Sequence, residues 1–148
     1  MIGLGLALLF IGGALGKAAC GWLGQHLGVV WSVIATELAT AVLIMTTLVL
    51  PLAPMLAILP LLGLVLNGTS SVLYGTVPDL APGGDIGRGF ALFYTGVIGA
   101  GGLAPIAYGA IADHSSRTFG MLAAAVTAAI IVPLVLALRP SLEGTRDA

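Results

Sequence analysis

The sequence has few charged residues, few aromatic residues and almost no cysteine. Of its 148 residues, 7% are charged and 6% are aromatic, and Cys20 is the single cysteine. Soluble domains carry about 25% charged residues, so five basic and six acidic side chains are too few to cover a water-facing surface. A lone cysteine excludes an internal disulfide and a cysteine-based metal cluster. The net charge of −1 leaves no basic face for nucleic acid.

Apolar residues dominate what remains. They make up 59% of the chain, and the mean hydropathy is +1.15. A membrane-spanning helix needs about 20 mostly apolar residues, and backbone inside lipid must form helices or closed barrels. The sequence therefore predicts an all-α membrane protein, with a transmembrane domain over residues 1–139 and a polar tail at 140–148. Five apolar stretches are expected to span the lipid bilayer: 2–23, 29–50, 55–77, 89–112 and 118–138.

The distribution of basic residues predicts the orientation of the five spans. Lys17 and Arg88 lie toward the same side as Arg139, at the end of the transmembrane domain, and Arg146 of the tail. Arg117 alone lies toward the other side. Basic residues collect on the cytoplasmic side of membrane proteins. We therefore expect a multi-pass protein of the cell (inner) membrane with a cytoplasmic C-terminus.

Lys17 and Glu37 are the only ionisable residues well inside the first two spans. Lys17 lies ten residues before Leu27, in the turn between these spans, and Glu37 lies ten residues after it. In an antiparallel hairpin the two residues occupy the same depth, and ionised groups are costly in lipid. This equal depth predicts that they form a structural ion pair. The alternatives are that Lys17 extends to the interface or that Glu37 takes part in proton coupling.

A polar stripe follows the third span. Asn67, Ser70 or Ser71, and Tyr74 recur at helical spacing. Such a stripe can line a watery cavity that binds solute, or it can form hydrogen bonds between helices, and the pattern favours neither. The stripe is polar but mostly uncharged, which favours uncharged or amphipathic small molecules over multiply charged ones.

The fourth span is rich in small residues and contains Pro105. Small residues allow close helix packing, and a proline removes a backbone donor and favours a kink. Tight packing is the preferred interpretation, and a flexible gating helix is the alternative. Tyr94 and Tyr108 are further candidates for solute contact. The glycines of this span lie at 96, 99, 101, 102 and 109.

Three segments resemble, in order, motifs of the major facilitator superfamily. Residues 21–28 (GWLGQHLG) resemble the loop that recurs between the eighth and ninth helices of that family, with matches at Gly21, Leu23 and Gly28. The family's acidic and arginine positions hold Gln25 and His26 instead.

Residues 77–82 and 87–89 resemble the loop between the tenth and eleventh helices of the family. The pattern Pro105, Gly109 and Asp113 resembles the end of the eleventh helix. This order and spacing extend over nearly the whole chain.

The resemblance implies that the chain corresponds to about the last five of twelve helices. It further implies alternating-access transport of a small solute, a missing N-terminal half as partner, and protons as a candidate coupling ion. In this view Lys17, Glu37 and the motif residues have gating or structural roles. The alternative is a non-transporting membrane scaffold, or a fragment that requires a partner half. The sequence contains no recognisable enzyme motif and predicts neither a cofactor nor a metal site.

Overall fold

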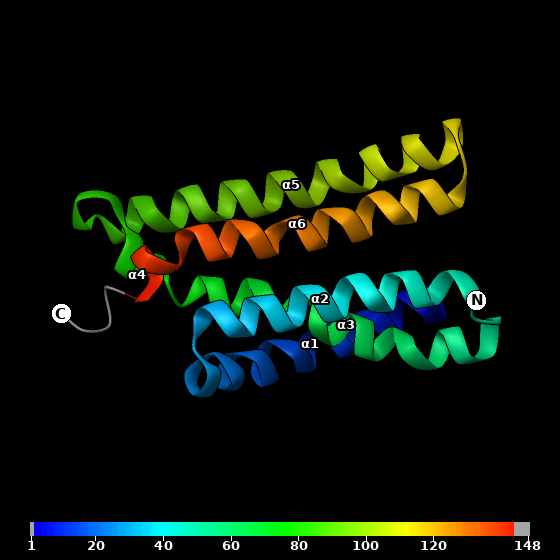
Figure 1. Ribbon diagram of the computed structural model, residues 1–148, viewed down its shortest axis with the longest axis horizontal. Helices are drawn as coiled ribbons and strands as arrows, with labels where there is room; N and C mark the ends of the chain where they lie inside the picture. Colours follow the sequence, from blue (N-terminus) through cyan, green and yellow to red (C-terminus); the bar gives the residue numbers. More distant parts are fainter. Residues whose placement is uncertain (1, 144–148) are drawn as a thin grey trace.

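The computed structural model describes residues 2–143 and shows an all-α membrane-type protein (Figure 1). Five of its helices are long and apolar enough to cross a membrane, which confirms the predicted fold class. The long helices are α1 (Ile2–Leu27), α2 (Val29–Val49), α3 (Leu52–Tyr74), α5 (Ile86–His114) and α6 (Arg117–Glu143). The short helices α4 (Val77–Leu80) and η1 (Pro82–Gly84) connect α3 to α5.

The first turn is shorter than predicted. Residues 24–27, which the sequence analysis assigned to the turn, continue α1, and the His26 ring Nδ1 donates a hydrogen bond to the Trp22 carbonyl at 2.9 Å. The change of direction is confined to Gly28, whose φ of 79° is one that side-chain-bearing residues rarely adopt. One residue therefore suffices to join α1 to α2.

Helices α1 and α3 run in parallel and approach each other very closely. A Cβ atom added at Gly12 would overlap the Pro60 carbonyl, and one added at Gly63 would overlap the Leu9 carbonyl. The two backbones are thus in direct contact, as small residues permit in membranes. Pro60 lies inside α3, and its missing N–H does not interrupt the helix.

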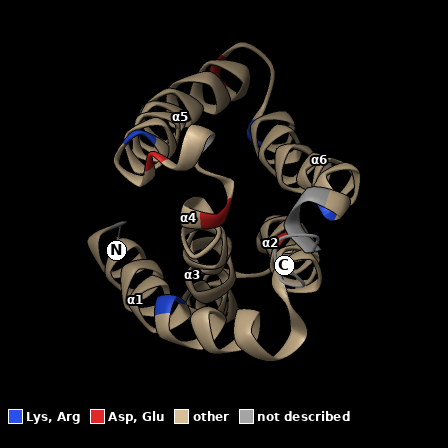
Figure 2. Cartoon of the chain, turned by 90° about the vertical axis from the view of Figure 1, so that its left-hand side faces the viewer, with Lys and Arg blue, Asp and Glu red and all other residues tan. Residues whose placement is uncertain are grey.

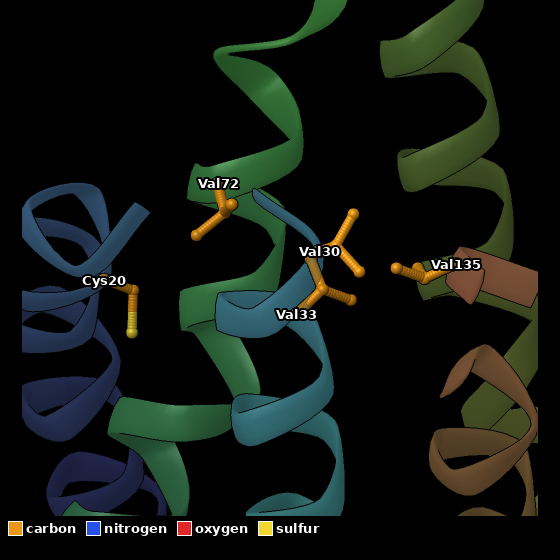
Figure 3. Packing of buried hydrophobic residues seen from close by; sticks show 5 residues of the cluster. All are labelled: Cys20, Val30, Val33, Val72 and Val135. Atoms are coloured by element: carbon orange, nitrogen blue, oxygen red, sulfur yellow. The ribbon is translucent and has the colours of Figure 1, made fainter. Parts of the chain in front are cut away.

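The remaining helices complete an open ring. Helix α2 packs against both α3 and α6, and α6 packs against α5. Viewed from the end of the bundle that holds α4, here called the α4 end, α3 lies between α1 and α2 (Figure 2). The core sits where α1, α2, α3 and α6 meet, and its buried cluster (Figure 3) consists of Cys20, Val30, Val33, Val72 and Val135.

Helix α5 is the least covered of the five. Of its residues, all within the described part of the chain, only Gly89 is buried. The helix continues through Pro105. A Cβ atom at Gly99, Gly102 or Gly109 would meet nothing within 4 Å, so these glycines do not mediate packing within this chain.

Candidate functional site

A cavity of about 340 Å³ lies between α1, α3 and α5. Its lining combines one ammonium group with hydroxyl groups and aromatic rings. The volume is at the lower end of the range of about 300–1,000 Å³ that is usual for small-molecule sites. The lining residues are Lys17, Ser70, Ser71, Tyr74, Phe93, Tyr94 and Val97.

Helix periodicity brings the polar stripe of α3 to this cavity. Ser70, Ser71 and Tyr74 lie within one turn of each other and share the face that α1 leaves uncovered. The Ser70 hydroxyl donates to the Asn67 carbonyl at 2.9 Å, which satisfies its proton and leaves oxygen lone pairs free. The stripe can therefore offer hydroxyl groups to a solute.

Aromatic rings from α3 and α5 form one wall of the cavity. The Tyr74 ring centre lies 4.8 Å from that of Phe90 and 6.1 Å from that of Phe93. Tyr94 lies 5.9 Å from both Tyr74 and Phe93. These tilted and edge-to-face contacts are favourable aromatic geometries, so the wall is held by mutual packing between the two helices.

Lys17 reaches the same cavity from α1. It lies ten residues before the end of α1 at Leu27, about 15 Å along the helix axis, and its side chain is exposed toward the cavity. Ionisable residues inside membrane spans almost always face a bundle interior or a water-filled space. The position of Lys17 fits that rule.

A second cavity of about 330 Å³ adjoins the first toward the α4 end. The two share Ser71. The second cavity reaches Gln25 in the last turn of α1 and Asp79 in α4, so polar groups continue from the connecting segments to Lys17. Its full lining is Gly21, Gly24, Gln25, Val29, Ser71, Val72, Gly75, Thr76, Asp79 and Leu80.

Two predicted solute-contact residues lie elsewhere. Asn67 does not line the cavity: its amide donates to the Gly63 carbonyl at 3.1 Å and packs against Gly13 of α1. Tyr108 is half-buried near Gly120 of α6 and lies fourteen residues beyond Tyr94, about 21 Å along α5. Helical periodicity placed Asn67 on the polar stripe of α3. The close approach of α1 covers the Asn67 side chain and keeps it out of the cavity.

The predicted Lys17–Glu37 ion pair is not formed. Lys17 faces the cavity, whereas Glu37 is buried, with 7% of its surface exposed, and has the Thr69 hydroxyl of α3 as its hydrogen-bonding neighbour. Neither residue has an ion-pair partner in the described part of the chain. The equal offset from Leu27 sets the depth of both residues but not the direction in which they point. The prediction was wrong because α3 lies between α1 and α2 (Figure 2).

The proposed gating and structural residues have different surroundings. Gly21 lines the second cavity, and Gly28 makes the turn between α1 and α2 with its positive φ. Pro105 and Gly109 lie on exposed parts of α5, and Asp113 is exposed one residue before that helix ends. Of these five residues, only Gly28 has a structural role that this chain alone defines, since a Cβ atom added at Gly21 would meet nothing within 4 Å.

Two features of the site were missed by sequence reasoning. Lys17 was assigned to an ion pair or to the interface, and Phe93 was not considered. The sequence signal for placing Lys17 at the cavity was a lone lysine in one span and a stripe of hydroxyl residues in another. The pairing of Phe93 with Tyr74 depends on how α5 folds back on α3, and no local pattern carries that information.

The arrangement can bind and orient a small molecule. An ammonium group, two serine hydroxyls and two phenols supply hydrogen bonds, and the rings supply an apolar surface. Among residues 2–143, no three His, Cys, Asp or Glu side chains are grouped so that they could hold a metal ion. Comparison with known proteins finds no matching family model and no significantly similar curated protein or solved structure.

Proposed function

We propose that this bundle forms part of the solute path of a secondary transporter of the major-facilitator type. The observation that carries the proposal is the cavity between α1, α3 and α5, in which Lys17, Ser71 and Tyr94 converge inside membrane-spanning helices. Polar and ionisable groups are costly in lipid. A path for a polar solute explains why such a cluster of polar groups lies inside the membrane-spanning helices.

The two adjoining cavities support a path rather than a closed pocket. They share Ser71, and the second extends to Gln25 and Asp79 at the α4 end. A solute entering from that end would pass Gln25, Asp79 and Ser71 before it reaches Lys17. Transporter sites near the middle of the bilayer, reached alternately from either side, have this organisation.

The family assignment rests on the sequence resemblance at residues 21–28, 77–82 and 105–113. The uncovered surface of α5 is consistent with a second helical half that packs there. In this proposal the chain contributes its part of the path at the inner membrane, and the second half contributes the rest. Coupling to protons belongs to the same proposal, with Glu37 as the one acidic residue buried in the bundle among the described residues.

Cysteine accessibility in native membranes tests the proposal. Ser71→Cys is introduced in a Cys20→Ala background, and a charged, membrane-impermeant thiol reagent is applied with and without a small-molecule extract of the host cells. We expect the thiol at position 71 to react and the extract to slow the reaction several-fold. Leu66→Cys is the matched control, because Leu66 is an exposed residue of α3 that does not line this cavity.

The alternative function is a membrane scaffold that moves no solute. It predicts that the thiol at position 71 either fails to react or reacts at a rate that the extract leaves unchanged. Equal reactivity at positions 66 and 71 would show that the reagent reaches α3 generally. Either result would overturn the transport proposal in favour of the scaffold.

A further inference from the structure

Lys17 has no compensating charge within reach of its cavity. The lining contains this one cation and no carboxylate, and Lys17 has no ion-pair partner in the described part of the chain. Glu37 is buried against α3 and does not line the cavity, and Asp79 lines the adjoining cavity instead. An ammonium group held inside a membrane span without a counter-charge is unfavourable. A bound anion would supply that charge.

The other walls of the cavity indicate the chemical character of the rest of the bound anion. Tyr74, Phe93 and Tyr94 place three aromatic rings around the cavity, and Val97 adds an apolar side chain. Aromatic walls favour flat, apolar groups, which stack on their faces or pack against their edges. Ser71 lies on α3 with Tyr74 and offers a hydroxyl group that can donate to an anionic oxygen, whereas the Ser70 proton is already donated to the Asn67 carbonyl.

The volume of the cavity and its single positive charge further restrict the class of ligand. A volume of about 340 Å³ is at the lower end of the range for small-molecule sites and accommodates a molecule of roughly the size of a substituted benzene ring. A single cation neutralises one negative charge, so a dianion would bring an uncompensated charge into the span.

The geometry points to a small organic monoanion with an aromatic or apolar body as the molecule that this cavity binds, with its carboxylate or equivalent group at Lys17. This inference rests on the proposed transport function and specifies its substrate class. It refines the sequence-based expectation, which favoured uncharged or amphipathic molecules because it placed Lys17 outside the stripe. Anionic lipid headgroups share the anionic chemistry, and the experiment separates them from a free solute.

Equilibrium binding to the full chain tests the inference. The chain is reconstituted into nanodiscs of zwitterionic phosphatidylcholine, and binding of radiolabelled benzoate is measured. Benzamide, phthalate and benzylamine compete as the neutral, dianionic and cationic probes. We expect saturable benzoate binding that benzamide, phthalate and benzylamine displace at least about tenfold less well than unlabelled benzoate, because a hydrogen bond to a charged group is worth about that factor.

Charge replacement at position 17 identifies the cation. Lys17→Gln should weaken benzoate binding about tenfold or more. Arg88→Gln is the matched control: it removes another basic residue toward the α4 end that lies outside the cavity, and it should leave binding unchanged. Lys17→Cys in the Cys20→Ala background should regain binding after reaction with aminoethyl methanethiosulfonate, which restores an ammonium group. The sulfonatoethyl reagent, which adds a negative charge, should not restore binding.

Several outcomes would overturn the inference. Binding of benzamide or benzylamine as tight as that of benzoate is one such outcome, and equal weakening of benzoate binding by Lys17→Gln and Arg88→Gln is another. If benzoate binds nowhere while added phosphatidylglycerol protects the thiol of Ser71→Cys, which leaves Lys17 in place, the occupant is a lipid headgroup. Protection of Ser71→Cys by cell extract but not by benzoate would reject the monoanion and retain transport. If neither cell extract nor benzoate protects the thiol of Ser71→Cys, the transport function itself is rejected.

Discussion

The hydroxyl groups of Thr36 on α2 and Thr69 on α3 lie 2.7 Å apart and form a buried hydrogen bond between the two helices. Thr36 also donates toward carbonyl groups of its own helix, and Thr69 is the hydrogen-bonding neighbour of Glu37. Thr69 of α3 is thus a hydrogen-bonding neighbour of both Thr36 and Glu37 of α2. The side chain that was expected to bind Lys17 is held by this cluster instead.

Removing the hydroxyl of Thr69 should destabilise the bundle more than removing that of Thr36. Interhelical hydrogen bonds in membranes are worth about 0.6 kcal/mol on average. Thr36→Val should cost about that amount, whereas Thr69→Val also leaves Glu37 without its neighbour and should cost more. Unfolding by sodium dodecyl sulfate in mixed micelles measures both. Thr127→Val is the control, because Thr127 is exposed and bonds only within α6; a cost for it equal to that of Thr69→Val would contradict the prediction.

Close contact between α1 and α3 should make Gly12 intolerant of a side chain. A methyl group there meets the Pro60 carbonyl, which is backbone and cannot rotate away. Gly12→Ala should therefore lower the free energy of unfolding by about 1–3 kcal/mol, as overpacking does. Gly3→Ala in the same helix meets nothing within 4 Å and should be neutral or slightly stabilising. Equal effects of the two substitutions in the same micelle assay would argue against backbone contact.

Lys17 and Glu37 should behave as independent residues. Because they are not paired, Lys17→Leu and Glu37→Leu should have additive effects on stability, within about 0.5 kcal/mol. Glu37→Leu should be the more costly, since it also leaves Thr69 short of a partner. A double-mutant cycle on folded protein in the membrane measures the coupling. If the double mutant recovers stability, the two residues are coupled, and the ion pair that sequence spacing predicted would be supported.

The orientation of the bundle can be tested with two single cysteines in a Cys20→Ala background. Asp85 precedes α5 at the α4 end, and Ser115 follows α5 at the opposite end (Figure 1). The excess of basic residues toward the α4 end predicts a cytoplasmic location for it. An impermeant reagent should therefore label Asp85→Cys only from the cytoplasm and Ser115→Cys only from outside. The reverse pattern would reject both the topology and the family resemblance.

The uncovered surface of α5 should be in contact with protein in native membranes if a second half exists. Ile98 and Leu103 are exposed by 70% and 69% in the chain by itself. A photo-crosslinking amino acid at either position should give a protein adduct. The same probe at Leu15 of α1, which is 61% exposed, serves as the comparison. Adducts with lipid alone at both α5 positions would place α5 against the bilayer.

Much of the fold follows from local properties of the sequence. The length of an apolar stretch and the positions of turn residues decide where a span begins and ends, because each helix satisfies its own backbone hydrogen bonds. The five spans and the ends of the bundle on which the connecting segments lie were predictable on that basis. Helical periodicity predicted a stripe of Asn67, Ser70 or Ser71, and Tyr74, of which Asn67 does not line the cavity. The exact turn at Gly28 was placed within a few residues.

The tertiary structure decided which way the side chains point. Depth along a helix follows from counting residues at a constant rise, and that count is what predicted one level for Lys17 and Glu37. Their directions depend on which helices are neighbours, and α3 takes the place between α1 and α2 because Gly12 and Gly63 let its backbone touch α1. That single packing choice turns Glu37 toward Thr69, leaves Lys17 to the cavity and covers Asn67. Contacts between helices far apart in the chain determine such rotations, and a local pattern does not contain them.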